Sequence, residues 1–182
     1  IIKTYDKILL PSYDVFDEDR YFTPGTDICI WELNIKDEKH TIGIQICEDL
    51  WDDDYDRKVS QELNNFGAEI IINISASAYR CDRLQERLEV LEKQVQSTKS
   101  TFIYLNMVGA QDELIFDGQS VILNNEGQLL AQGKAFQEDL IFCDLNSNQP
   151  PITLRKVPVE EDLYQALVLG VQDYFRKTGH ID

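Results

Sequence analysis

The residue best suited to chemistry in this sequence is Cys47, which directly follows an apolar run. Residues Ile42–Ile46 form a near-continuous apolar stretch, the pattern of a strand buried on both faces. A cysteine taken alone is most often inert packing, because cysteine is among the most buried residue types. Glu48 and Asp49 follow it here, however, and two carboxylates do not continue a core strand. Since ligands of layered α/β proteins bind beyond the carboxyl ends of strands, we predict that Cys47 faces a crevice.

A cysteine attacks as its thiolate, so it needs a base or a cation nearby that lowers its pKa. The two histidines are poor candidates, because His40 lies in a charged turn and His180 in the terminal tail, both typical of solvated surface positions. A Cys-His protease is therefore poorly supported. Lys7 could serve instead, because a desolvated ammonium can stabilise both a thiolate and an oxyanion. It lies three residues before Leu10 and Pro11, at another predicted strand end, although its immediate context is that of an ordinary surface lysine.

Composition bounds the class of protein. The chain has 182 residues and 43% apolar residues, enough for one domain with a full core. Its net charge of −16, from 33 acidic and 17 basic residues, disfavours nucleic acid and anionic membrane surfaces as partners. No stretch approaches the ~20 apolar residues of a membrane span and no signal peptide is present, so we expect a cytoplasmic protein. Neither a disulfide framework nor a metal site is indicated by the four widely separated cysteines, Cys29, Cys47, Cys81 and Cys143.

Strand and helix patterns alternate along the chain and predict a mixed sheet layered with helices. Helices are predicted at Arg57–Phe66 and along the apolar stripe Leu84, Leu88, Leu91 and Val95. A half-buried strand at Cys29–Ile35 is expected to pair antiparallel with Ile42–Ile46 across the turn at Lys36–His40. The other predicted strands are Ile8–Leu10, Glu69–Ile74, Thr101–Leu105, Ser120–Leu123, Leu129–Gln132 and Leu140–Leu145. Met107–Gly118 is interpreted as a loop, with a structural role for Asp112 and Asp117.

The composition changes near residue 146. Asn146–Pro151 is a polar segment that ends in two prolines, the pattern of a linker. A helix is predicted to open at Glu160 and Glu161 and to continue to Lys177, with apolar residues at helical spacing. Because a single helix cannot bury its own apolar stripe, this helix is expected to begin a second domain.

Three segments then fall in one order along the chain: Lys7-x-x-Leu10-Pro11 with FDEDRYFTPG, next IGIQICEDLW, and last NISASAYRCDR. In this combination the sequence resembles the nitrilase, or carbon–nitrogen hydrolase, superfamily, whose members use a Glu-Lys-Cys triad on an αββα sandwich. More narrowly, VFDEDRYF, ICEDLW, SAS and YLNMVGAQDELIFDGQS resemble the glutaminase domain of the glutamine-dependent NAD(+) synthetases. The tail EEDLYQALVLGVQDYFRKTG is similar to the helix that opens their synthetase domain. The resemblance covers nearly the whole chain.

The resemblance implies a fold and a division of the chain. The fold class would be α/β, a nitrilase-like αββα sandwich incomplete at its N-terminus, with one C-terminal helix of a following synthetase domain. Residues 1–145 would form the glutaminase part, 146–158 the linker, and 159–182 the start of an ATP pyrophosphatase-type synthetase domain. ATP and Mg would bind in that following domain, whose pyrophosphate loop is expected after residue 182, and no cofactor is implied for the present residues. Homo-oligomers are expected from the family.

The resemblance also implies roles for individual residues. Cys47 would attack the side-chain amide of L-glutamine, forming a thioester and releasing ammonia, and Lys7 would support the oxyanion together with backbone N–H groups near Glu48. Ser77 would bind the amino-acid end of the substrate, and Arg83 could pair with its α-carboxylate. The full set of implied substrate-binding residues is Tyr13, Glu48, Trp51, Ser77 and Arg83. In the intact enzyme the ammonia would amidate an adenylated deamido-NAD to NAD.

One departure and two alternatives accompany this interpretation. The family's general base is a glutamate far upstream of the lysine, and no glutamate precedes Lys7 in this sequence, so we expect very low turnover from these residues alone. Glu18 could be an accessory glutamate, although an ion pair with Arg20 or Arg57 is an equally good account. A stand-alone amidase or carbamoylase would keep Lys7 and Cys47 but has no need of the linker and last helix. A non-catalytic scaffold domain is the third interpretation.

Overall fold

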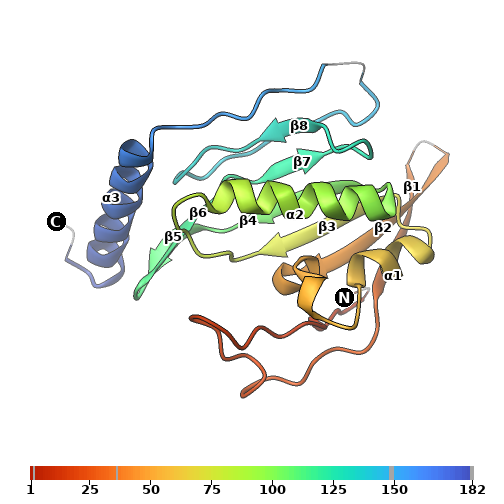
Figure 1. The fold of residues 1–182 in the computed structure, drawn as a ribbon, viewed down its shortest axis with the longest axis horizontal. Coiled ribbons are helices and arrows are strands. Elements are labelled where there is room, and N and C mark those ends of the chain that lie inside the picture. The colour runs from red at the N-terminus through yellow and green to blue at the C-terminus, as the bar shows by residue number, and fades with distance from the viewer. Residues whose placement is uncertain (2, 36, 148–149, 181–182) are drawn as a thin grey trace.

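The computed structural model describes residues 1, 3–35, 37–147 and 150–180. Its centre is a six-stranded mixed sheet in the order β1-β2-β3-β4-β7-β8, with a separate two-stranded hairpin, β5-β6 (Figure 1). The strands are β1 (Cys29–Ile35), β2 (Glu38–Ile46), β3 (Ile70–Ser75), β4 (Thr101–Asn106), β5 (Val108–Gln111), β6 (Leu114–Asp117), β7 (Val121–Leu123) and β8 (Leu129–Gln132). The longer helices are α1 (Val59–Asn65), α2 (Arg83–Thr98) and α3 (Val159–Lys177), and two short 3-10 turns are η1 (Cys47–Leu50) and η2 (Asp52–Asp54).

The three central strands, β2, β3 and β4, run parallel, so their carboxyl ends meet at one edge of the sheet. Antiparallel strands flank them, with β1 beside β2 on one side, and on the other side β7 beside β4 and β8 beside β7. The pairing of β1 with β2 confirms the predicted antiparallel pair, although β2 begins earlier than predicted, at Glu38. Part of the predicted turn, residue 36, lies outside the described residues.

Helices α1 and α2 lie on one face of the sheet (Figure 1). The face beneath them is fully buried and apolar at its centre, where Ile71 pairs in register with Phe102 and both have no exposed surface. Gly43 of β2 lies at the same level, where an added Cβ would come within 3.1 Å of Leu63 and Ala68. Across the opposite face, apolar side chains such as Ile74 and Leu105 remain about half exposed. The chain thus supplies one helix layer and one sheet of a layered α/β fold.

Two predicted strands are absent from the structure. Residues 3–28 contain no strand. Ile8 and Leu9 are buried in the core, but their backbone N–H groups donate to the Asp49 carboxylate instead of to a neighbouring strand. Leu140–Leu145 also lacks strand pairing, and Leu140 is largely exposed. Conversely, the predicted loop Met107–Gly118 forms the hairpin β5-β6.

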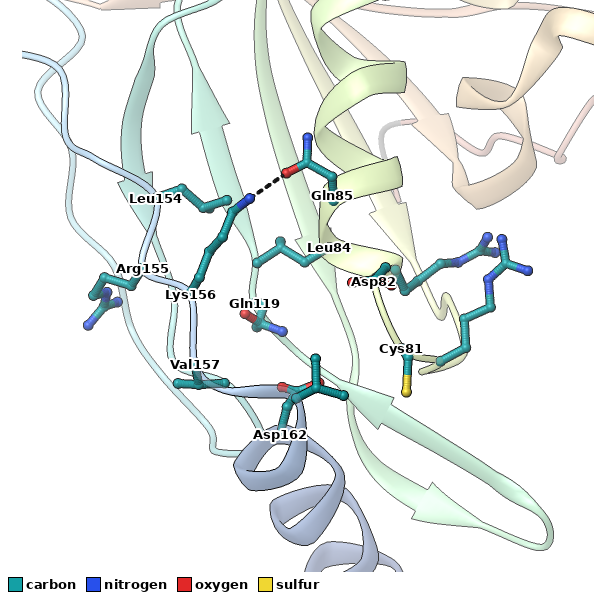
Figure 2. Close-up of a pocket in the computed structure, with 13 residues that line it drawn as sticks. Cys81, Asp82, Leu84, Gln85, Gln119, Leu154, Arg155, Lys156, Val157 and Asp162 are labelled. Atoms are coloured by element: carbon teal, nitrogen blue, oxygen red, sulfur yellow. Dashed lines mark hydrogen bonds between the residues drawn. The ribbon is translucent and has the colours of Figure 1, made fainter.

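The predicted linker lies against the sheet, apart from residues 148–149, which fall outside the described part. Ile152 N–H donates to the carbonyl of Leu129 at 2.8 Å, and the backbone N–H and guanidinium of Arg155 bond to Gln132 of β8. Lys156 donates to Gln85 at the start of α2 at 3.0 Å, as Figure 2 shows. The connection to α3 therefore follows the edge of the domain.

Helix α3 packs on the β5-β6 hairpin rather than on the main sheet (Figure 1). Asp173 accepts a hydrogen bond from the Ala110 N–H at 2.8 Å, and the Tyr79 hydroxyl donates to Asp162 at 2.7 Å. The apolar stripe of α3 is largely exposed, as at Leu167 and Val171, each 56% exposed. None of the helices in the described part of the chain is both long and apolar enough to cross a membrane.

Candidate active site

Cys47 lies directly beyond the carboxyl end of β2, as predicted, and opens the turn η1. Its φ of +43° is in the left-handed region, which a non-glycine residue rarely adopts and which surrounding contacts must hold. One such contact comes from the adjacent strand β3, where the Asn73 side-chain amide donates to the Cys47 carbonyl at 3.2 Å. A second is the Ile46 N–H, which donates to the Asp49 carboxylate at 2.9 Å. These contacts fix the turn that carries the thiol.

Opposing influences act on the Cys47 thiol. Burial raises its pKa above the ordinary value, because an apolar setting disfavours the thiolate. The positive charge of Lys7, the Ala76 N–H and the Ser75 hydroxyl act in the opposite direction and lower the pKa. The structure therefore brings Lys7 near Cys47, although the two residues are 40 positions apart. A cation beside a partly buried thiol is the arrangement that a cysteine nucleophile requires.

Lys7 itself pairs with Glu18, and both side chains are largely buried. The possibility that Glu18 pairs with Arg20 or Arg57 was wrong, because Arg20 pairs with Asp17 and Arg57 with Glu62. A carboxylate thus lies against the ammonium group next to the cysteine.

Glu48 is 4% exposed and receives hydrogen bonds from two phenols. The Tyr13 hydroxyl lies 3.0 Å from both carboxylate oxygens, and the Tyr55 hydroxyl donates to one of them at 3.0 Å. Burial raises the pKa of Glu48, while the two phenols and Lys7 oppose that rise. Tyr55 was not singled out from the sequence, since it follows the run of aspartates at 52–54 and carries no periodic signal.

Ser77 and Arg83 come from the segment that follows β3 and from the first turn of α2. Arg83 Nε lies 3.3 Å from the Ser77 hydroxyl, and its guanidinium carbon lies 4.6 Å from the centre of the Trp51 ring. Stacking on an indole and an ion pair with Glu86 at 3.0 Å hold this guanidinium in place. Burial and Glu48 raise the pKa of Tyr13, and the positive charge of Arg83 opposes that rise. The seven residues predicted from the sequence therefore lie around one edge of the sheet.

A hollow of about 570 Å³ lies beside this cluster and is walled by Tyr13, Glu48 and Trp51 together with Tyr55. A second, smaller hollow, which Arg83 helps to line, lies between the start of α2 and residues Leu154–Val157 (Figure 2). Among the described residues, no group of three or more histidine, cysteine or acidic side chains is placed to hold a metal ion.

The structure also shows a buried ion pair that supports the site from below. Arg87 of α2 and Asp117 at the end of β6 have 0% and 1% of their side chains exposed, and two nitrogens of Arg87 reach two oxygens of Asp117 at 2.7 and 2.8 Å. Arg87 also donates to the carbonyl of Ser77 at 2.9 Å. The structural role predicted for Asp117 is confirmed by these contacts.

Comparison with known proteins shows the family to which the chain belongs. The carbon–nitrogen hydrolase family model matches residues 1–149. The chain belongs to this family. The nitrilase-like fold class predicted from the sequence is thereby confirmed, and a carbon–nitrogen hydrolase from Helicobacter pylori shares this fold at a TM-score of 0.59 and 23% identity over 72% of this chain and 48% of that one.

Other relatives match almost the whole of this carbon–nitrogen hydrolase chain. It is 38% identical to the glutamine-dependent NAD(+) synthetase of Synechocystis over 96% of its own length and 33% of that protein. The structure of glutamine-dependent NAD+ synthetase from Acinetobacter baumannii, in complex with ADP, has a TM-score of 0.82 and 28% identity over 98% of this chain and 33% of that one. The chain thus spans about a third of the length of these relatives.

Proposed function

We propose that this chain is the glutaminase part of a glutamine-dependent NAD(+) synthetase, in which Cys47 releases ammonia from the side chain of L-glutamine. The observation that carries the proposal is the convergence of a partly buried cysteine and a lysine at the carboxyl edge of parallel strands. A nucleophile, a cation for the oxyanion, and polar groups for a small amino acid are the parts that amide hydrolysis through a thioester requires.

The chemical step follows from these positions. The Cys47 sulfur attacks the amide carbon, and the resulting oxyanion is stabilised by the Lys7 ammonium and by backbone N–H groups of the turn around Glu48. Collapse breaks the C–N bond, the thiol proton leaves with the nitrogen as ammonia, and water then cleaves the thioester to give glutamate and the free thiol. A glutamate acting as general base upstream of Lys7 is implied by the family resemblance and is not among residues 1–6.

The polar ends of the substrate fit two places in the cluster. The guanidinium of Arg83, held by Trp51 and Glu86, could pair with an α-carboxylate in the two-nitrogen geometry that arginine favours. The Glu48 carboxylate, with Tyr13 beside it, offers a negative partner for an α-ammonium. A charged group at each place would select a free amino acid over a simple amide.

Residues after 149 support the synthetase assignment over the stand-alone amidase. The family model ends at residue 149, whereas the synthetases from Synechocystis and Acinetobacter baumannii match 96% and 98% of this chain and so extend into α3. This supports the division into 1–145, 146–158 and 159–182. The released ammonia would then serve an ATP-dependent amidation of deamido-NAD in the intact enzyme, which we expect to be a homo-oligomer.

The residues present do not fit a site for ATP or Mg. The nine glycines are dispersed along the sequence and form no phosphate-binding loop. In the described part of the chain no acidic cluster is placed to hold a metal ion. No step of the glutaminase chemistry is therefore routed through a nucleotide or a metal.

The proposal is tested by the intact mass of the protein after incubation with a diazoketone analogue of glutamine, which alkylates a thiol in a glutamine site. We expect a single adduct that is absent from Cys47→Ala and retained in Cys81→Ala, since Cys81 is exposed and lies outside the cluster. Excess L-glutamine should protect against labelling. An adduct retained in Cys47→Ala, or no adduct at all, would favour the scaffold interpretation.

A further inference from the structure

One buried carboxylate connects the segment that carries Lys7 to the turn that carries Cys47. Asp49 has no exposed surface, and one of its oxygens accepts hydrogen bonds from the backbone N–H groups of Ile8 at 3.0 Å and Leu9 at 2.9 Å. Its other oxygen accepts from the Ile46 N–H at 2.9 Å and from the Tyr5 hydroxyl at 2.7 Å. Two of these donors are the residues that directly follow Lys7, and a third directly precedes Cys47.

The pairing of strands in the sheet does not fix the position of Lys7. Residues 3–28 contain no strand, so no ladder of backbone bonds sets the distance of Lys7 from β2. The Ile8 and Leu9 N–H groups are buried and would be unpaired without the Asp49 oxygen, which is a costly state for a backbone donor. The position of the Lys7 ammonium relative to the thiol therefore depends on this carboxylate.

We propose that Asp49 is a positioning residue that holds the Lys7 ammonium against the Cys47 thiol. The proposal rests on the proposed function, in which Lys7 and Cys47 act on the same amide. Asp49 is only two residues from Cys47, but both of its oxygens are occupied by four donors, so it acts through the backbone and not as a proton carrier. An ionised carboxylate can accept all four hydrogen bonds, whereas an amide of the same shape must turn its N–H groups either toward Ile8 and Leu9 or toward Ile46 and Tyr5, and of these only the Tyr5 hydroxyl can accept. Asp49→Asn should therefore leave at least one backbone N–H unpaired and weaken the link between the Lys7 segment and the Cys47 turn, while the side-chain volume stays nearly the same.

The test measures the rate of alkylation of Cys47 by iodoacetamide over a range of pH, read by peptide mass spectrometry with the exposed Cys81 as internal reference. The positive charge of Lys7 lowers the pKa of Cys47, so Lys7→Met should move the rate profile to higher pH. Asp49→Asn should move it in the same direction and slow alkylation below the pKa by up to about tenfold, the change that a rise of about one in the pKa produces. The double variant should show no further change, because both substitutions remove the same interaction.

The matched control is Asp52→Asn, which makes the same chemical change at another carboxylate that is 4% exposed. Asp52 accepts from Gln94 of α2 and forms no hydrogen bond or ion pair with the described residues around Lys7, so the control should leave the alkylation profile of Cys47 unchanged. An Asp49→Asn profile equal to that of the unchanged protein, or a displacement that adds fully to that of Lys7→Met, would overturn the proposal.

If Asp49→Asn does not fold, Tyr5→Phe decides the question, because it removes one donor and leaves the carboxylate with its three backbone N–H groups. A smaller displacement to higher pH that disappears in the Lys7→Met background supports the proposal, and a displacement that adds fully to that of Lys7→Met overturns it. Iodoacetamide needs no glutamine site. If the iodoacetamide profiles of the single and double variants behave as predicted but the glutamine analogue does not label Cys47, the proposed function is refuted while the positioning role of Asp49 stands.

Discussion

Replacement of Arg87 by methionine should be among the most destabilising single changes in this protein. The substitution keeps a long apolar side chain in the space beneath the site but removes the charge, leaving the Asp117 carboxylate buried without its cation. Breaking a buried pair in this way typically costs about 3–5 kcal/mol. We expect a cost of about 3 kcal/mol, because Gln119 and Asn106 still donate to Asp117, at 2.9 and 3.4 Å. Domains of this kind have only about 5–15 kcal/mol of stability to lose.

The measurement is urea unfolding followed by tryptophan fluorescence, in which Trp51 reports on the site directly. Arg80→Met is the matched control, because Arg80 also pairs with a glutamate, Glu86, but is 58% exposed and its pair is screened by solvent. The control should lose at most about 1 kcal/mol. The reasoning fails if Arg87→Met costs no more than Arg80→Met. It is strengthened if Arg87→Met with Asp117→Leu is more stable than Arg87→Met alone, since the double change removes the unpaired charge as well.

Three further predictions concern pH, the last helix and the core. Burial raises the pKa of Glu48, Asp49 and Asp52, whereas the pKa of Glu86 is lowered by its bonds to Arg80 and Arg83. The three raised groups bind protons more tightly in the folded state than in the unfolded state, so the free energy of unfolding should be larger at about pH 5 than at pH 7. Urea titrations at both pH values check this. Tyr79→Phe removes the hydrogen bond to Asp162 and should increase amide hydrogen exchange in the first turns of α3 with little change in β3. If the exchange rates in α3 equal those of the unchanged protein, the contacts with the β5-β6 hairpin alone keep the helix in place. Gly43→Ala should lower stability by about 1–3 kcal/mol in thermal melts, because the new Cβ meets Leu63 and Ala68 at 3.1 Å, and a neutral or stabilising result would show that α1 can shift outward.

Much of the layered fold could be predicted from local patterns. The apolar runs of β2, β3 and β4 and the stripe of α2 give periodicities that depend on a few consecutive residues, so their positions were predicted within a few residues. The hairpin β5-β6 was missed because it does not alternate clearly, and its turn uses Asp112 at a φ of +51°. Leu140–Leu145 has the composition of a strand but no partner strand, and a strand exists only where another chain segment accepts its backbone bonds.

One signal for the support beneath the site was present in the sequence and was not used. Arg87 lies three residues after Leu84 and four before Leu91, on the stripe of α2 that faces the sheet. A charged residue on a buried helix face requires a buried partner, which predicts an ion pair without saying where its carboxylate lies. Asp117 is 30 residues away, and only the packed structure brings it to Arg87.

The sequence by itself determined that a cysteine stands at the end of a buried strand, beside acidic residues, in a chain whose segments resemble the carbon–nitrogen hydrolases. These features are local, because a few consecutive residues indicate both that a strand is buried and where it ends. The resemblance implied that Lys7 and Cys47 act together, but only the tertiary structure decided how they are brought near each other, since the two belong to segments 40 positions apart and Lys7 is in no regular element. Their proximity arises from hydrogen bonds that converge on Asp49, and side-chain to backbone bonds of this kind follow no sequence period.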